Sequence, residues 1–180
     1  LTIYRSQIDN WIIWIPSYRG FWEPRNIRSV LSKGLEYNIQ LKGFFSEFNY
    51  KVSATYSYTS AVNQGDPLVW SDKSYGKQLV YIPLHSGNLM MQLGWNDLFF
   101  TYQYNAYSER FTTSSNDVTR RDRLYPYFMN DISAGSTFRL KKVDFSLEVK
   151  VYNLLNESYH TLLYRPMPGR NYQLVLIIRI

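Results

Sequence analysis

The 180-residue sequence contains no cysteine. Disulfide bonds and thiolate metal sites are therefore excluded, and the redox compartment stays undetermined. The two histidines, His85 and His160, lie far apart and lack the spacing of metal ligands. Asp66 and Asp72 form only a weak pattern for calcium. We expect no cofactor and no bound metal.

The sequence also lacks any run of about 18 apolar residues, the length that a membrane-spanning helix requires. A membrane protein that crosses the bilayer with β-strands is not excluded, because strands in which apolar and polar residues alternate contain no such run. No signal peptide is recognisable at Leu1, and the first residues, LTIYRS, already alternate. We therefore expect the chain to be a fragment that begins inside a strand.

Sequence motifs of catalysis are absent as well. There is no G-x-S-x-G or comparable nucleophile motif and no glycine-rich phosphate loop, so we expect no enzymatic activity. The formal net charge is +6, but lysine and arginine are scattered, with small clusters only at 120–123 and 141–142. This distribution does not favour nucleic acid as a partner.

Aromatic residues are abundant, at 18% of the sequence, and they suit strands and the membrane–water boundary. From Val143 to Asn153, apolar and polar residues alternate strictly, which is typical of a strand with one apolar face. Similar alternation recurs along the chain. It predicts about eight strands, at 1–14, 28–44, 49–62, 84–95, 98–111, 126–139, 143–155 and 171–180.

The predicted connections alternate between short and long. Short turns are expected at 46–48, 96–97 and 139–142, and long connections at 15–27, 63–83, 112–125 and 156–170. Up-and-down outer-membrane barrels have this asymmetry. The strands are also longer than the usual five or six residues of soluble sheets, which disfavours a soluble sandwich, and are long enough to cross a bilayer. The sequence predicts an all-β, antiparallel, up-and-down transmembrane β-barrel.

The C-terminal segment NLLNESYHTLLYRPMPGRNYQLVLIIRI resembles the closing segment of TonB-dependent outer-membrane receptors. In that family an Asn-Leu-(Phe/Leu)-Asn stretch ends the penultimate strand and a Pro-Gly-Arg-aromatic stretch opens the last one. The matching residues are Asn153, Leu154, Leu155, Asn156, Pro168, Gly169, Arg170 and Tyr172. The chain ends on Ile180, where the family usually has an aromatic residue. We expect a structural, barrel-closing role for this motif, with Arg170 paired to a carboxylate of the inner wall.

Upstream segments also resemble the family. They are IDNWI at 8–12, the Gly34-x-Glu36 strand, and IPLHSGNLMMQLGW with Pro83 and His85. The resemblance implies a 22-stranded barrel with an amino-terminal plug, of which residues 1–180 would be the last eight strands. The plug and the earlier strands would then be absent from this chain.

A complete eight-stranded barrel with a structural or adhesive role is the alternative. The interior of such a barrel is just wide enough for side chains to fill, so its inward faces should be bulky. The predicted inward positions here are small, as at Ser53, Thr55, Ser133 and Gly135. The small residues favour a wider barrel.

The resemblance implies TonB-dependent import of a scarce, bulky nutrient across the Gram-negative outer membrane. The IDNWI and Gly34-x-Glu36 arrangement is most similar to the cobalamin-receptor branch, so cobalamin is expected first and a ferric siderophore next. The implied partners are outer-membrane lipid, the plug and remaining strands, TonB through the absent upstream segment, a surface-exposed accessory lipoprotein and the small-molecule nutrient. The C-terminus would be periplasmic and the long loops extracellular.

The long predicted loops carry aromatic residues beside charged ones, a combination that can hold a bulky amphipathic ligand. The candidate ligand-binding residues are Tyr18, Arg19, Phe21, Trp22, Arg25, Trp70 and Tyr75. The alternative is that these rings belong to the outer aromatic girdle or pack loop on loop.

Overall fold

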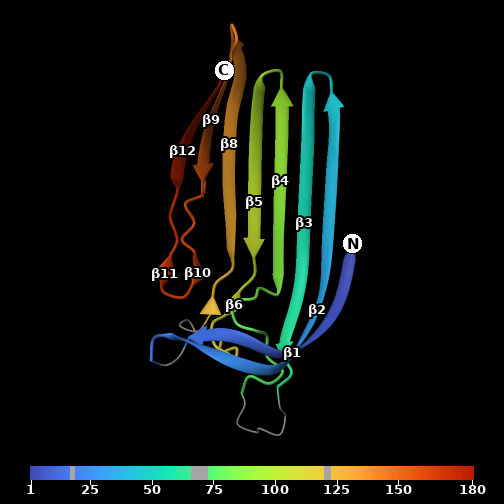
Figure 1. The fold of residues 1–180 in the computed structure, drawn as a ribbon, viewed down its shortest axis with the longest axis vertical. Coiled ribbons are helices and arrows are strands. Elements are labelled where there is room, and N and C mark those ends of the chain that lie inside the picture. The colour runs from blue at the N-terminus through green and yellow to red at the C-terminus, as the bar shows by residue number, and fades with distance from the viewer. Residues whose placement is uncertain (17–18, 66–72, 120–122) are drawn as a thin grey trace.

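The computed structural model describes residues 1–16, 19–65, 73–119 and 123–180. In these residues one antiparallel sheet contains eight strands, in the order β1-β2-β3-β4-β5-β8-β9-β12. Figure 1 shows them side by side. The strands are β1 (Thr2–Pro16), β2 (Trp22–Phe45), β3 (Phe48–Asn63), β4 (His85–Trp95), β5 (Leu98–Tyr107), β8 (Tyr127–Leu140), β9 (Val143–Tyr152) and β12 (Asn171–Arg179). The predicted fold class is confirmed.

One face of this sheet is largely apolar from β2 to β12, and we call it the apolar face. Because paired residues of neighbouring strands point to the same side, the register shows which side chains share a face. One row across five strands consists of Trp95, Leu98, Ser136, Leu147 and Leu176. Large side chains here are exposed, for example Leu174 at 70%. An extended exposed apolar surface marks a contact with a membrane or a partner.

The opposite face, which we call the polar face, carries small and hydrogen-bonding residues. A row three residues further from the short turns consists of Gln92, Thr101, Ser133, Lys150 and Gln173. Lys150 forms an ion pair with Glu148 at 3.1 Å. The small residues predicted to point inward lie on this face, because Ser53 pairs with Met90 and Ser133 with Lys150. The predicted facing of the strands is confirmed.

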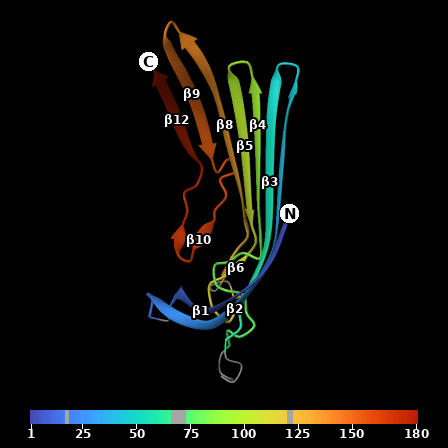
Figure 2. The ribbon, with the colours of Figure 1, turned by 45° about the vertical axis from the view of Figure 1, so that its right-hand side comes forward.

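The two ends of the sheet differ (Figures 1 and 2). At one end, strands are joined by two-residue turns at 46–47, 96–97 and 141–142, as predicted. The first residue of each turn, Ser46, Asn96 or Lys141, has a positive φ. The long connections gather at the other end. A small buried core of Val30, Ala61 and Leu79 lies there, with Trp11 and Ile82 packed against it.

The predicted long loop at 15–27 is wrong. β1 continues to Pro16 and β2 begins at Trp22, so a short connection joins two long strands. Pro16 and Pro24 argued for a loop, because proline cannot donate a ladder hydrogen bond. β3 pairs with β2 only from Val30 onward, so Pro24 lies where β2 has β1 as its sole neighbour in the sheet. A proline is tolerated on such a free edge. This part of the hairpin bends away and runs beneath the other strands (Figures 1 and 2).

Other connections also contain short strands. The predicted strand 98–111 ends at Tyr107, and two small hairpins pair β6 (Arg110–Phe111) with β7 (Arg123–Leu124) and β10 (His160–Leu162) with β11 (Arg165–Pro166). Within the described ranges no helix is long and apolar enough to cross a membrane.

The sheet is open. Among the described residues, β1 pairs with β2 alone and β12 with β9 alone, so the two edge strands do not meet. A closed eight-stranded barrel would require that pairing. The alternative of a complete small barrel is therefore not supported.

Candidate functional site

Aromatic rings and an arginine meet at the long-connection end of the sheet. Tyr107 and Tyr127 are cross-strand partners on β5 and β8, with ring centroids 5.0 Å apart. Tyr159, from the connection between β9 and β12, packs on Tyr127 at 4.8 Å. The Arg110 guanidinium lies 4.8 Å from the centroid of the same ring. Together with Tyr81, whose electrostatic effect reaches Arg110, these residues form what we call the tyrosine–arginine cluster.

Arg110 joins two connections of the chain, the one between β5 and β8 and the one between β9 and β12. Its side chain is buried, with 5% of the residue exposed. Nη2 donates hydrogen bonds to the carbonyl oxygens of Tyr125 at 3.4 Å and His160 at 3.0 Å. In the part of the chain that the structure describes, Nε has no acceptor. Burial lowers the pKa of the Arg110 guanidinium, and the neighbouring Tyr127 opposes this shift. A buried cation without a carboxylate partner is costly, so this site favours an incoming acceptor.

Further hydrogen-bond donors lie close to Arg110. Tyr81 is placed beside β6 because its backbone N–H donates to the Phe111 carbonyl at 2.8 Å. Thr112 Oγ1 and Arg123 Nε are buried and have no partner among the described residues. Burial raises the pKa of Tyr81 and the Leu163 backbone beside it opposes this shift, so the phenol stays protonated and able to donate. The region therefore combines two guanidinium groups with hydroxyl groups that can donate hydrogen bonds.

A pocket of about 230 Å³ adjoins this cluster, between the chain at 123–127 and the chain at 158–164. We call it the loop pocket. Its aromatic and charged lining residues are Arg123, Tyr125, Tyr127, Tyr159, His160 and Tyr164. Arg123 forms an ion pair with Glu109 at 3.1 Å and lies 5.1 Å from the centroid of the Tyr125 ring. Rings and a guanidinium together suit a flat ligand group that carries negative charge.

The substitution Arg110→Met is expected to loosen the two connections that Arg110 joins. Methionine keeps an unbranched apolar stem but removes both hydrogen bonds to backbone carbonyls. Hydrogen bonds to charged groups contribute about 1.5–3 kcal/mol, so amide exchange at 108–126 and 156–166 should accelerate roughly tenfold or more. Hydrogen exchange of the complete protein measures this. Arg165→Met, at an exposed position of β11, is the control, and equal exchange in both variants would contradict the assigned role.

The structure places some of the candidate ligand-binding residues and leaves others aside. Tyr18, Trp70, Asp66 and Asp72 lie outside the described residues, and Arg25 is part of β2 rather than of a loop. Arg19 and Phe21 lie in the β1–β2 connection. The Trp22 ring, at the start of β2, is 5.5 Å from the Tyr81 ring, which brings it near the tyrosine–arginine cluster. Tyr75 is 44% exposed in the connection between β3 and β4. Ligand binding by these residues stays a prediction.

The tyrosine–arginine cluster was not predicted from the sequence. Arg110, Tyr81, Tyr127 and Tyr159 are far apart in the chain, and no single motif contains them. The segment Tyr125-Pro126-Tyr127 is a local signal for part of it. The proline restricts Tyr125 to an extended conformation, which limits the positions of the two tyrosine rings ahead of the strand. Among the described residues, no group of three His, Asp or Glu side chains could hold a metal ion.

The barrel-closing motif links the two ends of the connection between β9 and β12. Asn153 is 2% exposed and has a positive φ of 52°. Its Oδ1 accepts from the Glu157 N–H at 2.7 Å, and its Nδ2 donates to the carbonyls of Glu157 at 2.8 Å and Pro168 at 3.4 Å. Asn156 Oδ1 accepts from the Arg170 N–H at 2.9 Å. These bonds make the motif a structural clasp in this chain.

The structure explains the glycine of the motif but leaves the predicted ion pair of its arginine untested. A Cβ atom on Gly169 would approach Asn156 Oδ1 to 2.8 Å, which explains a glycine at this position. Arg170 is exposed and has no ion pair among the described residues, so its expected pairing with an inner-wall carboxylate stays a prediction. Tyr172 and Ile180 are exposed at the two ends of the last strand region, and Tyr172 pairs with Val151 on the apolar face.

Comparison with known proteins identifies the fold. Residues 1–154 match the family model described as "TonB dependent receptor-like, beta-barrel". No curated protein sequence matches the chain significantly.

Several solved structures are similar to the chain. The ferric preacinetobactin receptor BauA of Acinetobacter baumannii is 14% identical, with a TM-score of 0.68, over 96% of this chain and 25% of that one. The siderophore receptor PiuA of the same species is 20% identical, with a TM-score of 0.69, over 97% and 25%. The ferric enterobactin receptor PfeA of Pseudomonas aeruginosa, as a G324V mutant, is 20% identical, with a TM-score of 0.64, over 97% and 27%. The chain thus spans about a quarter of the length of these structures.

Proposed function

Because this chain belongs to the TonB-dependent receptor β-barrel family, we propose that it forms part of the wall and outer loops of a receptor that imports a ferric siderophore. Family members are outer-membrane transporters of Gram-negative bacteria and not enzymes. The observation that carries the choice of substrate is the donor-rich tyrosine–arginine cluster at the long-connection end. Ferric siderophore complexes present many oxygen acceptors and often carry negative charge. The arginine and the hydroxyl groups of this cluster would accommodate both.

The rest of the barrel and the plug would be supplied by the remainder of the receptor. The chain matches about a quarter of each similar structure, and both edges of its sheet are unpaired among the described residues. An unpaired edge strand exposes backbone donors and acceptors, which cannot be left unsatisfied in lipid. In the complete receptor, further strands would therefore pair with β1 and β12.

The orientation of the chain in the outer membrane is proposed from its family. The two-residue turns would face the periplasm and the long connections, with the tyrosine–arginine cluster and the loop pocket, would face the outside. A substrate that arrives from outside would meet this end first. Coupling to TonB would take place through the segment upstream of the barrel. An accessory lipoprotein stays a prediction.

The proposal places ferric siderophores before cobalamin as the substrate. The sequence resemblance indicated the opposite order. The solved structures compared above are described as receptors for siderophores or ferric siderophores. Their low identity shows only the fold, so the choice depends mainly on the chemistry of the cluster and of the loop pocket. That pocket, at about 230 Å³, would take one aryl arm of a siderophore rather than the whole complex.

Equilibrium binding to the purified complete receptor tests the proposal. Ferric enterobactin, ferric citrate and cobalamin would each be titrated while tryptophan fluorescence is recorded. We expect a ferric complex to bind at submicromolar concentration and cobalamin not to bind. Tight binding of cobalamin without binding of a ferric complex would overturn the proposal.

The substitution Arg123→Gln is expected to weaken binding of the ferric complex about tenfold, since a lost charge-assisted contact contributes about 1.5–3 kcal/mol. Arg123 lines the loop pocket, whereas Arg165 does not. Arg165→Gln is therefore the matched control and should bind as the wild type does. Unchanged affinity in Arg123→Gln would show that the ferric complex does not bind in the loop pocket.

A further inference from the structure

The apolar face has an open groove near the short-turn end. It lies across β4, β5, β8 and β9 and has a volume of about 570 Å³. Two small residues, Ala134 and Ser136, form its floor, because their cross-strand neighbours are much larger. Phe100 and Val149 flank Ala134, and Leu147 flanks Ser136. The volume falls within the roughly 300–1,000 Å³ typical of ligand pockets.

The position of the groove restricts what it can bind. The face that contains it is the exposed apolar face, which lies against hydrocarbon in a membrane barrel. A water-soluble substrate has no access from that side. An occupant must be long and apolar and must already reside in the bilayer, and these are the properties of a lipid acyl chain.

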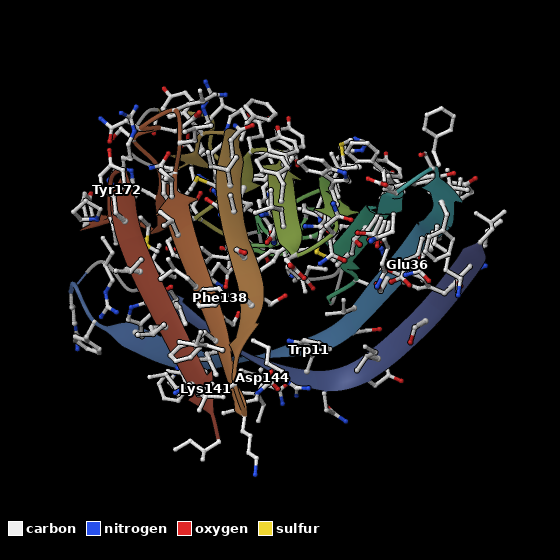
Figure 3. All side chains as sticks on the ribbon, turned by 90° about the horizontal axis from the view of Figure 1, so that it is seen from above. Trp11, Glu36, Phe138, Lys141, Asp144 and Tyr172 are labelled. Carbon is white, nitrogen blue, oxygen red and sulfur yellow. The ribbon has the colours of Figure 1, made fainter. Side chains whose placement is uncertain are left out.

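The β8–β9 hairpin extends the groove toward a charged tip. Leu98, beside the β4–β5 turn, pairs with Ser136, so the hairpin projects beyond that turn. The apolar face continues on it over Phe138 and Phe145, whose rings stack at 5.3 Å. The hairpin ends in Lys141 and Lys142, about 17 Å from Ser136 at ~3.4 Å per residue. Figure 3 shows Lys141 at this end of the hairpin.

The two lysines are the cations at the tip of the hairpin, whereas Arg139 and Arg179 lie beside Asp144 on the polar face. Neither lysine has an ion pair among the described residues, whereas Arg139 is bound to Asp144 by two hydrogen bonds, of 2.5 and 2.8 Å. The acidic residues nearby lie in the other short turns, where Glu47 accepts a hydrogen bond from Trp95 Nε1 at 3.1 Å and Asp97 lies beside Thr137. An anionic group is therefore attracted to the tip of the β8–β9 hairpin rather than to the neighbouring turns.

We propose that this groove binds a single anionic glycerophospholipid. One acyl chain lies over Ala134 and Ser136, and the phosphate contacts Lys141 and Lys142. A second groove, of about 380 Å³, lies on the same face at the opposite end, over Gly87 and Ala106. It is lined by no lysine or arginine, so it provides a matched control.

Native mass spectrometry of the delipidated complete receptor, titrated with phosphatidylglycerol, tests the proposal. The wild type is expected to retain one phosphatidylglycerol in preference to phosphatidylcholine. Ala134→Leu fills the groove, and Lys141→Gln with Lys142→Gln removes the phosphate contact. Each should raise the apparent Kd at least tenfold, while Ala106→Leu should leave it unchanged.

Each of the other results counts against the proposal. Wild-type binding in both Ala134→Leu and the double lysine variant would overturn it. An equal loss in Ala134→Leu and Ala106→Leu would show unspecific contact of lipid with the whole apolar face. Loss in Ala134→Leu alone would overturn the headgroup contact. The lysines lie in an exposed turn, so their variant stays informative even if Ala134→Leu fails to fold.

Discussion

Replacement of Leu147 by arginine is expected to prevent stable insertion of the barrel. Leu147 lies in the middle of β9 on the apolar face, between Ser136 on β8 and Leu176 on β12. An arginine that faces lipid costs up to about 2–4 kcal/mol, the value at the midplane of the bilayer. That amount is a large fraction of the stability of a typical folded domain, about 5–15 kcal/mol. The folded fraction after refolding into liposomes, read from heat-modifiable electrophoretic migration, measures the effect.

Ser146→Arg is the matched control, one residue away on the same strand. Ser146 pairs with Thr137 and Ile177 on the polar face, where a charged side chain can reach water. We expect this variant to refold to nearly the wild-type extent. Similar losses in both variants would show that the two faces of β9 are assigned wrongly.

The second large effect is expected for Asn153→Ala. The side chain of Asn153 makes three hydrogen bonds to the backbone of Glu157 and Pro168, and alanine removes all of them. Glu157 is half-buried and Pro168 is exposed, so water can reach part of what alanine leaves unpaired, and each lost hydrogen bond costs about 0.5–1.5 kcal/mol. The positive φ of 52° adds strain, because residues other than glycine and asparagine lose about 1–2 kcal/mol there. We expect a loss of about 2–4 kcal/mol in the free energy of unfolding.

Urea unfolding of the refolded receptor in liposomes measures this loss. Leu155→Ala is the control, because Leu155 is 65% exposed two residues further along the same turn. That variant should change the free energy of unfolding by less than about 0.5 kcal/mol. A loss for Asn153→Ala no larger than that of the control would mean that the motif does not hold the connection between β9 and β12.

The strands could be predicted from the sequence because their signal is local. An apolar residue at every second position sets the facing of a whole strand, as from Val143 to Val151, and neighbouring strands repeat it. The predicted loop at 15–27 was wrong for a non-local reason. Whether a proline such as Pro24 breaks a strand depends on whether the next strand reaches it, and β3 does not.

The candidate site was predicted less well. The closing motif could be found because Asn153 and Asn156 lie close in sequence to the turn that they form. The tyrosine–arginine cluster assembles from β5, β6, β8 and the connections after β3 and β9, and only the strand pairing brings Tyr107 and Tyr127 together. Burial of Arg110 without a carboxylate partner has no signature in the local sequence.

The most direct test of the account is uptake of a radiolabelled ferric siderophore by cells that lack their own receptors. The complete receptor would be expressed in such cells with and without TonB. We expect uptake that requires both the receptor and TonB and that falls with Arg123→Gln at limiting substrate. Uptake that is unchanged without TonB, or import of cobalamin with no import of iron, would contradict the proposed import of a ferric siderophore.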